Sequence, residues 1–432
     1  MAQHAQESAA LRHVRSVLLR SPHVQLHRLR RLDERIAGHL DGVGVAGLAG
    51  LDALEAALES PTPGAVFALA VCALQGRHAP LLTRLVTLAA TLPEAERGFL
   101  SAMGWVSSQD LQGTVRALLG SAVPVHRAWA LAACAMHRVD PGAVLTQAVS
   151  DADAVVRARA WRVAGQLGRR DLADAARQAL LGPSSAQHDE HATVVIAPGA
   201  RDANKRAAAW ALTLWGMGQN DIVRQALIAV EPGQSLPPHD AHRLAALAAP
   251  MDWGRDQVRT LAGQAEANLP VKRRMMCLAA WVGDVQVIPW LIHHMADDRW
   301  ARLAGEAFSL VTGADLAALS LERKPPEGIQ PGPTDKPEDH DVAMDEDDSL
   351  PWPDQARVQA WWQTHAARFV AGQRYFAGEP PSLAHAEHVL KTAGQRQRII
   401  AAEYLCLLQP GSVMFPVAAP AWRQSRWLSA KA

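Results

Sequence analysis

The chain has 432 residues, 49% of them apolar and only 5% aromatic, and its 43 basic residues balance its 43 acidic ones. The shortage of aromatic residues argues against a β-rich protein. The zero net charge argues against a dedicated nucleic-acid binder, whose affinity comes largely from neutralising phosphates. No apolar run is long enough to predict a membrane-spanning helix or a signal peptide, so we expect a cytoplasmic protein.

Residues 1–62 are predicted to form a helical entry region ahead of the main body. Leu26, Leu29, Ile36 and Leu40 recur at helical spacing and predict a basic amphipathic helix over residues 26–40. Beyond residue 62 the character of the sequence changes, because a regular pattern begins.

From residue 63 to 321 the chain repeats itself about every thirty residues. Most repeats carry an arginine at the same place: Arg97, Arg127, Arg157, Arg206, Arg243, Arg273 and Arg302. A helix-start residue precedes each arginine: Pro93, Pro124, Asp153, Asp202, Asp240, Pro270 and Asp298. A second start follows in every arginine repeat but that of Arg273: Asp110, Asp140, Asp171, Asp221, Asp256 and Asp315. Since Asp caps the first free N–H groups and Pro fits the first turn, each repeat is predicted to be helix, tight turn, helix.

Phe67 heads a further copy that lacks the arginine, with Pro63 and Pro80 as its two helix starts. A single pair of short helices cannot bury its own apolar face, whereas stacked pairs share a continuous core. The predicted fold is therefore all-α, an α-solenoid of about eight short HEAT-like hairpins with helical N- and C-terminal extensions.

One insertion, over residues 182–201, breaks the period between Arg157 and Arg206. Insertions in repeat arrays form loops at one edge and often bind partners, although a tolerated surface loop is the simpler interpretation. His188-Asp-Glu-His191 within it has the residue types of a metal site but not the spacing of one. We expect a solvated loop there.

Residues 322–355 are acidic and rich in proline, with eight acidic residues between Asp335 and Asp348. Such a segment has too little apolar mass to offset its ordering entropy, so it is predicted to be a flexible linker. The run Asp345–Asp348 lacks the glycine and register of a calcium loop. Residues 356–432 are predicted to be a C-terminal helical region, with helices over 354–376 and 396–408.

The sequence contains no recognisable catalytic or metal-binding motif. His293-His294 are adjacent on a helix and therefore point to different sides. His385-Ala-Glu387-His388 has the wrong spacing for a zinc protease. No Gly-rich phosphate loop or nucleophile elbow occurs. We expect no enzyme, no cofactor and no metal.

The arginines allow two interpretations: a structural ladder, in which each pairs with a capping Asp of its neighbour, or a row that faces a ligand. Their recurrence beside the caps favours the ladder. For partner contact the second helices are the better candidates, because such helices line the inner curve of similar arrays. Polar residues recur on them eighteen to twenty-one positions after the arginine: Arg116, Gln147, Arg177, Arg224, Gln225 and His293. Their mixed character suits a protein surface better than a phosphate groove. An ordinary solvated helix face is an equally good interpretation.

Asp153-Ala-Val-Val-Arg157, followed by an apolar helix and Gly168, resembles a short HEAT-like repeat. The wider chain resembles a bacterial family of HEAT-like repeat proteins whose genes accompany those of type VI secretion. The stretches that carry this resemblance are Leu32-Asp-Glu-Arg35, His39-Leu-Asp-Gly-Val43, Ala46-Gly47, Gly372-Gln-Arg-Tyr-Phe376, Gln395-Arg-Gln-Arg398, Ala401-Ala-Glu403 and Pro420-Ala-Trp-Arg-Gln424. The resemblance implies an adaptor role near effector or spike proteins, and it supplies no catalytic residues.

Three hypotheses follow. The first is a non-enzymatic scaffold or adaptor that binds a partner protein, such as a secretion effector or spike component. The second is a HEAT-like enzyme or enzyme subunit, resembling a DNA glycosylase or a lyase, which the zero net charge disfavours. The third is a self-assembling structural protein. We prefer the first.

Overall fold

The computed structural model describes residues 2–59, 61–181, 198–231, 233–266, 268–327 and 345–430. Every regular element in these ranges is a helix, and β-pairing is limited to three isolated bridges. The all-α prediction is therefore confirmed. The chain divides into two compact units, one of residues 1–20, 24–215 and 410–432, the other of residues 21–23 and 216–409.

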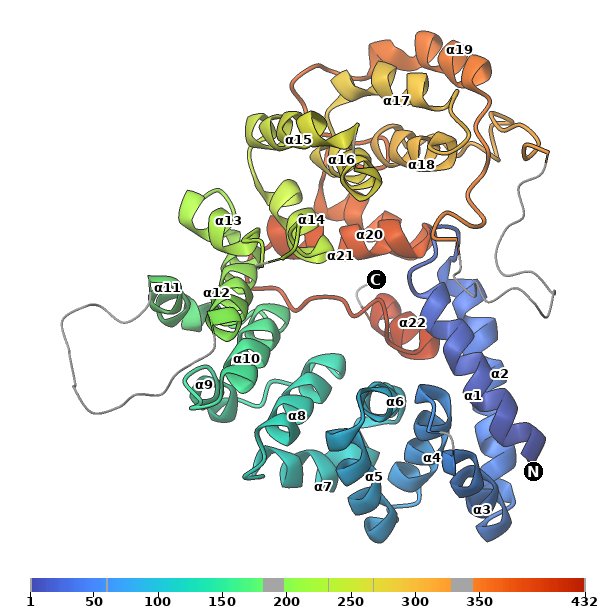
Figure 1. Cartoon of the computed structure of the whole chain (residues 1–432), viewed down its shortest axis with the longest axis vertical. Helices are drawn as coiled ribbons and strands as arrows, with labels where there is room; N and C mark the ends of the chain where they lie inside the picture. Colours follow the sequence, from blue (N-terminus) through green and yellow to red (C-terminus); the bar gives the residue numbers. More distant parts are fainter. Residues whose placement is uncertain are drawn as a thin grey trace. The chain divides into compact units, whose positions relative to one another are not determined.

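The first unit contains an entry region, a run of paired helices and the last helix of the chain (Figure 1). Its helices are α1 (Ala2–Leu18), α2 (Leu26–Val45), α3 (Leu48–Ala56), α4 (Pro63–Gln75), α5 (Ala79–Thr91), α6 (Pro93–Trp105), α7 (Ser108–Leu119), α8 (Pro124–Met136), α9 (Ala143–Ala148), α10 (Ala154–Gln166), α11 (Ala173–Leu181), α12 (Pro198–Leu212) and α22 (Ala421–Ser429).

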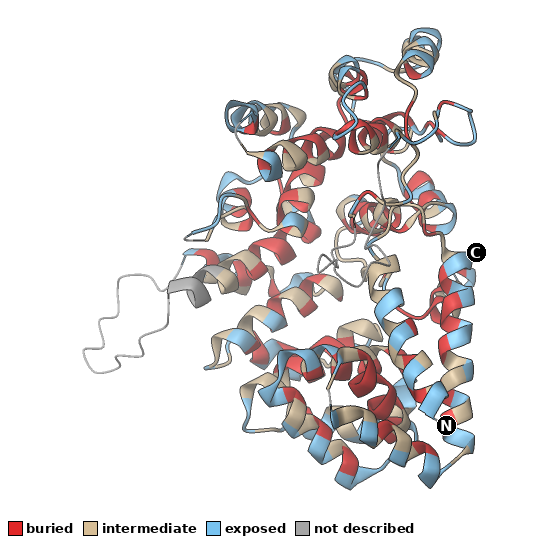
Figure 2. Ribbon diagram, turned by 45° about the vertical axis from the view of Figure 1, so that its right-hand side comes forward, coloured by how far each residue is buried: buried red, intermediate tan, exposed pale blue. Residues whose placement is uncertain are grey.

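The first helices of the repeats pack on one another in chain order, α4 on α6, α6 on α8, α8 on α10 and α10 on α12. Each second helix packs against the first helix that follows it, as α5 does on α6 and α7 on α8. This packing buries the first helices more than the second helices (Figure 2). Almost every residue of α4 is buried, whereas α5 and α7 alternate buried and exposed residues. In α4 the packing of α1 and α6 on opposite sides leaves no exposed first turn, which accounts for the missing arginine.

The second unit repeats this arrangement with fewer pairs. Its helices are α13 (Asp221–Leu227), α14 (His239–Ala248), α15 (Met251–Ala265), α16 (Leu269–Val282), α17 (Ile288–His294), α18 (Ala301–Thr312), α19 (Gln355–His365), α20 (Leu383–Thr392) and α21 (Gln395–Leu408). Here α14 packs on α16 and α16 on α18, with α15 and α17 against the helix that follows each. The hairpin of α20 and α21 packs on α14.

Most of the predicted helix starts are correct to within three residues. Pro93 and Pro124 begin α6 and α8, and Asp153 caps α10 by accepting hydrogen bonds from Val155 N (2.8 Å) and Val156 N (3.2 Å). Three predicted starts are wrong: Asp202 and Asp256 lie inside α12 and α15, which begin earlier, and Asp315 caps only a turn.

Later segments of the chain cover the C-terminal ends of α14, α16 and α18 in the second unit and of α6 and α10 in the first. In the second unit Gly283 and Gly313 end α16 and α18 with φ of +69° and +73°. Tyr375 N donates to Gly283 O at 2.8 Å, and Ala377 N donates to Leu310 O at 2.6 Å. Helix ends leave carbonyls without intrahelical donors, so this segment satisfies them.

The first unit uses the same device with the last part of the chain. Gly168 follows α10 with φ of +70°, and Met414 N donates to Gln166 O at 2.8 Å. A Cβ at Gly168 would lie 2.1 Å from Gly411 O, so only glycine fits between the helix end and this segment.

The C-terminal third of the chain differs from its predicted organisation. The zones 322–355 and 356–432 do not form separate parts, because residues 345–409 pack within the second unit and residues 410–430 within the first. The helix predicted over 354–376 ends at His365, followed by a 3-10 turn over Ala366–Arg368. Residues 374–376 instead pass the end of α16, and the turn at Ala377–Gly378 lies at the end of α18.

Gly283→Ala is expected to lower the free energy of unfolding by roughly 3 kcal/mol, since it adds backbone strain and a steric overlap. The new Cβ would lie 2.2 Å from Tyr375 O. Gly372→Ala is the matched control, because Gly372 has φ of +84° but nothing within 4 Å of an added Cβ. We expect it to cost about 1 kcal/mol, the strain alone. Equal losses in urea unfolding would show that the covering segment exerts no constraint.

Candidate functional site

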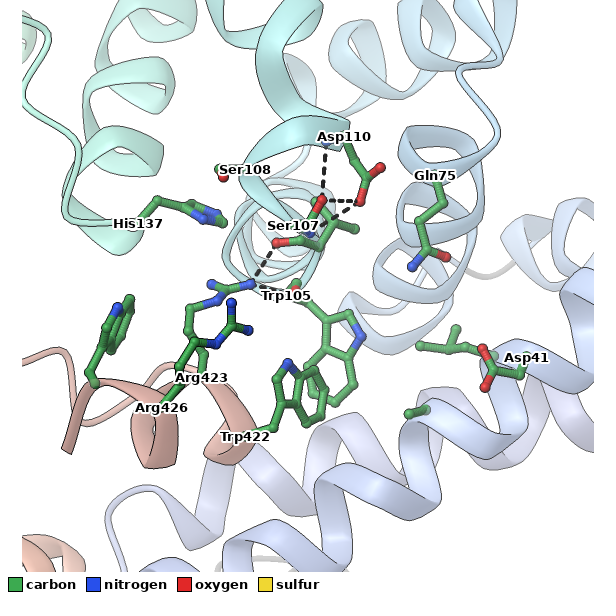
Figure 3. A pocket seen from close by; sticks show the side chains of 14 residues that line it. Asp41, Gln75, Trp105, Ser107, Ser108, Asp110, His137, Trp422, Arg423 and Arg426 are labelled. Atoms are coloured by element: carbon green, nitrogen blue, oxygen red, sulfur yellow. Dashed lines mark hydrogen bonds between the residues drawn. The ribbon is translucent and has the colours of Figure 1, made fainter. Parts of the chain in front are cut away.

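A cavity of about 400 Å³ lies in the first unit, where α22 meets the ends of several helices (Figure 3). It is lined by Ala37, Leu40, Asp41, Gln75, Trp105, Val106, Ser107, Ser108, Asp110, His137, Trp422, Arg423, Arg426 and Trp427. These residues come from α2, from the last residues of α4 and α6, from the turns after α6 and α8, from the start of α7 and from α22. The cavity is thus built by the edge of helix ends and the segment that covers it.

A buried carboxylate fixes the start of α22. Asp33 is fully buried and accepts hydrogen bonds from Ala421 N at 2.7 Å and from Arg15 Nε at 2.6 Å. Arg15 also donates to Ala418 O and Ala419 O at 3.1 Å each. Because Ala421 N is the first amide of α22, the Asp33 carboxylate caps this helix from a distant part of the sequence.

Arg423, also on α22, completes the end of α6. Its guanidinium donates to Gly104 O (2.9 Å), Trp105 O (3.0 Å) and Val106 O (2.6 Å), as Figure 3 shows in part. Burial, with the nearby charges of Arg426 and Arg15, lowers the pKa of Arg423 to about 10. The carbonyls at the negative end of the helix dipole therefore hold a buried cation.

Several polar groups of the cavity are occupied by structural contacts. Asp110 and Ser107 form the capping box of α7. His137 bonds through Nε2 to Met103 O at 2.8 Å, and burial lowers its pKa. A ligand could contact Arg426 and Asp41, which are exposed, and the face of Trp422. The rings of Trp422 and Trp105 are nearly perpendicular, with their centroids 4.8 Å apart. Both charges and indole surface suit a peptide segment.

The predicted partner-contact residues fall into two groups. Arg116, Gln147, Arg177, Gln225 and His293 are exposed on second helices, although Arg177 pairs with Asp174 one turn away. Arg224 differs from the prediction. It is only 6% exposed, donates to Gly218 O and Gln219 O, and lies over the ring of Trp253. The short α13 turns this side chain onto its own preceding loop, so Arg224 cannot meet a partner.

In the first unit the arginine ladder forms at one step. The Nε and Nη2 atoms of Arg127 donate to the carboxylate of Asp151 in the next repeat, at 3.0 and 2.8 Å. Arg157 donates to the backbone carbonyl of Asp151 at 2.7 Å. Burial alone would raise the pKa of Asp151, but these hydrogen bonds and charges hold it below its ordinary value. Arg97 instead pairs with Glu94 in its own helix, exposed to solvent. Arg206 lies half-buried on α12.

In the second unit the arginines bind the C-terminal part of the chain. Arg243 holds Glu403 of α21 through two hydrogen bonds of 2.8 and 2.7 Å. Arg273 and Arg302 bind the acidic run that was predicted to be a flexible spacer. That prediction is wrong for residues 345–355. Asp347 is only 6% exposed, and these arginines supply the stabilisation that the apolar content lacks.

The remaining candidates have structural partners or lie outside the description. His385 bonds to Phe376 O at 2.7 Å, and His294 meets the Trp290 ring edge-on. Within the described ranges, no group of three His, Cys, Asp or Glu side chains is placed to hold a metal ion. The insertion 182–201, including His188 and His191, falls outside the described residues apart from the first turn of α12. No helix in the described part of the chain has the length and apolar character to cross a bilayer.

The stretches behind the family resemblance mark intrachain contacts. Asp33 caps α22, Arg374 donates to Ala246 O (2.8 Å) and Ala249 O (2.7 Å) at the end of α14, and Glu403 binds Arg243. Arg374 thus repeats at α14 what Arg423 does at α6. Sequence analysis missed both arginines as helix caps, because nothing local signals that a side chain reaches a distant helix end.

Arg423→Gln is expected to lower the free energy of unfolding by about 3 kcal/mol, because buried carbonyls at the end of α6 lose their donors. Arg426→Gln, on the same helix, is the control and is expected to change stability by less than about 0.5 kcal/mol, since Arg426 is exposed. Thermal unfolding monitored by tryptophan fluorescence would measure both. Similar behaviour of the two variants would refute the capping role.

The second unit is expected to lose stability in mild acid. Burial, followed by the charge of Arg274, lowers the pKa of His242 to about 4, against about 6.5 in an unfolded chain. Because the unfolded state binds the proton more tightly, stability is full above about pH 6.5 and falls towards about pH 4. Unfolding between pH 7.5 and 5 should therefore be less pH-dependent in His242→Leu than in wild type. The exposed His388→Leu should leave the pH dependence unchanged.

No family model matches the chain, and no curated protein or solved structure resembles it at a significant level.

Proposed function

We propose that the chain is a HEAT-like α-solenoid that acts as a non-enzymatic scaffold and binds a partner protein. The chain-order packing of first helices in each unit supports the solenoid, since this packing is what repeats of about thirty residues produce. The period and the packing follow from one requirement, because a helix pair needs a neighbour to cover its apolar face.

The observation that carries the binding role is that each unit already holds a later segment of its own chain against the ends of its stacked helices. Residues 374–378 are bound along the ends of α14, α16 and α18 by backbone hydrogen bonds and by Arg374. Met414 and Arg423 bind the ends of α10 and α6 in the same manner. A surface that binds segments of its own chain has the chemistry to bind those of another protein.

The exposed side chains of the second helices provide a regular surface for such a partner. Arg116, Gln147 and Arg177 lie on the successive second helices α7, α9 and α11. Packed helices are about 8–10 Å apart, which is about three residues of an extended strand. One scaffold side chain per repeat therefore meets about every third residue of a bound peptide.

The resemblance to proteins encoded beside type VI secretion genes suggests the context. We propose that the partner is a secretion effector, spike or adaptor protein, bound in the cytoplasm before export. This proposal rests on the resemblance alone and is independent of the binding surface.

A second candidate function is the binding of a small or peptide-end ligand in the cavity beside α22. The half-buried Trp422 and Trp427 and the exposed Arg426 and Asp41 favour it, because they join indole surface to both signs of charge. If the protein were an enzyme, the cavity beside α22 would be its candidate substrate site among the described residues.

Arg116→Glu with Arg177→Glu is expected to reduce capture of the partner at least tenfold while leaving the fold intact, since both side chains are exposed. Arg28→Glu with Arg31→Glu is the matched control, because it makes the same charge change on the exposed face of α2. Capture would be measured by quantitative co-purification from the native host and then with the purified partner.

Equal capture by both double variants would exclude the second-helix surface. Persistent large homo-oligomers in light scattering, without a defined partner, would instead favour a self-assembling protein. A shift of duplex DNA that weakens steeply with salt would favour the enzyme hypothesis.

A further inference from the structure

Three arginines from different helices of the second unit converge on one short acidic segment. Arg273 (α16) binds Asp347 through two hydrogen bonds of 2.7 and 2.6 Å, and its Nε lies 2.8 Å from Glu346. Arg302 (α18) binds Asp345 and also donates to Asp347 O at 3.0 Å. Arg396 (α21) donates to Glu346 O. We call these three arginines the arginine cradle.

The cradle would carry excess positive charge without this segment. In the described part of the chain, Arg273 and Arg302 form ion pairs only with residues 345–347. Arg396 has a second carboxylate partner in Glu306, at 2.5 Å. Without the segment, Arg273 and Arg302 would lose the carboxylates that they bind, which favours binding of another acidic chain.

An aromatic anchor adds specificity to the acidic contacts. Trp352 is 7% exposed and lies beneath the guanidinium groups of Arg302 (4.7 Å to the ring centroid) and Arg323 (5.5 Å). Its carbonyl accepts a hydrogen bond from Arg323 N at 2.7 Å. The bound pattern is therefore Asp-x-Asp followed five residues later by Trp, held by charge, cation–π contact and backbone pairing.

The segment between these anchors contributes little to the core. Residues 345–350 contain no helix beyond a turn, and Glu346, Asp348, Ser349 and Leu350 are exposed or half-buried. Residues 345–350 are held to the arginine cradle mainly by ion pairs and hydrogen bonds. A second acidic segment can form the same contacts with these arginines. A continuous hydrophobic interface would not permit such an exchange.

We propose that the arginine cradle is a recognition site for an acidic segment of the partner protein, and that Asp345–Trp352 is its intrachain occupant. A partner segment with acidic residues two apart and a following aromatic residue binds by replacing the occupant. The occupant is tethered and present at millimolar effective concentration, so it sets the affinity that a partner must exceed. This inference rests on the proposed scaffold function and specifies the chemistry of its partner.

The probe is a fluorescent peptide of residues 345–353, Asp-Glu-Asp-Asp-Ser-Leu-Pro-Trp-Pro, titrated by anisotropy against the full chain. The variant D345N/E346Q/D347N weakens the occupant and is expected to bind the peptide at least tenfold more tightly than wild type. Adding Arg302→Gln should abolish the gain, and raising the salt concentration should reduce it.

Two controls accompany the titration. A peptide with Asn-Gln-Asn in place of its first three residues should not bind. The variant D252N/D256N/E266Q makes the same charge change on the exposed face of α15 and should bind the acidic peptide no better than wild type.

A folded triple variant that binds the acidic peptide no more tightly than the neutral peptide would overturn the proposal. If the triple variant does not fold, Asp345→Asn decides. This variant removes the carboxylate that Arg302 binds, while Asp347 stays bound to Arg273. Its affinity for the peptide should increase about threefold. No gain there would also overturn the proposal. Partner capture that persists without peptide binding would reject the cradle but retain the scaffold function.

Discussion

The carbonyl groups at the ends of the stacked helices are the constraint on which each unit depends. Helices that stack side by side in chain order bring their C-terminal ends to one edge, and every end leaves carbonyls without a donor. A buried, unsatisfied carbonyl costs about 1–3 kcal/mol, so this edge requires a cover. Residues 374–378 cover α14, α16 and α18, and residues 411–427 cover α10 and α6.

The same geometry explains why arginine is so prominent. Its planar group holds five donors in a fixed fork that can span several carbonyls, whereas lysine offers three donors on one compact ammonium. Arg374 and Arg423 do so at helix C-termini, where the dipole favours a cation. At the opposite ends the ladder arginines bind carboxylates or loop carbonyls. The arginine cradle extends this use, because its carboxylates come from a segment with little core of its own.

Sequence periodicity predicted the helix pairs well, because each pair is encoded locally by a cap, an apolar stripe and a second cap. It failed where the competing influence was distant. Asp202 and Asp256 have the residue type of a cap, yet α12 and α15 begin earlier. The acidic run 345–348 has the composition of a flexible linker, and Arg273, Arg302 and Arg396 from distant helices give it a fixed place. Arg224 has the spacing of a contact residue, but Trp253 and its own loop bury it.

The amino-acid sequence by itself determined the helical class, the thirty-residue period and most of the helix starts, since these follow from contacts within a few residues. The tertiary structure alone decided which distant residues satisfy the helix ends, which arginines remain exposed, and where the cavity beside α22 lies. Those features depend on pairs such as Asp33 with Ala421, hundreds of residues apart. No local pattern specifies the partner in such a pair.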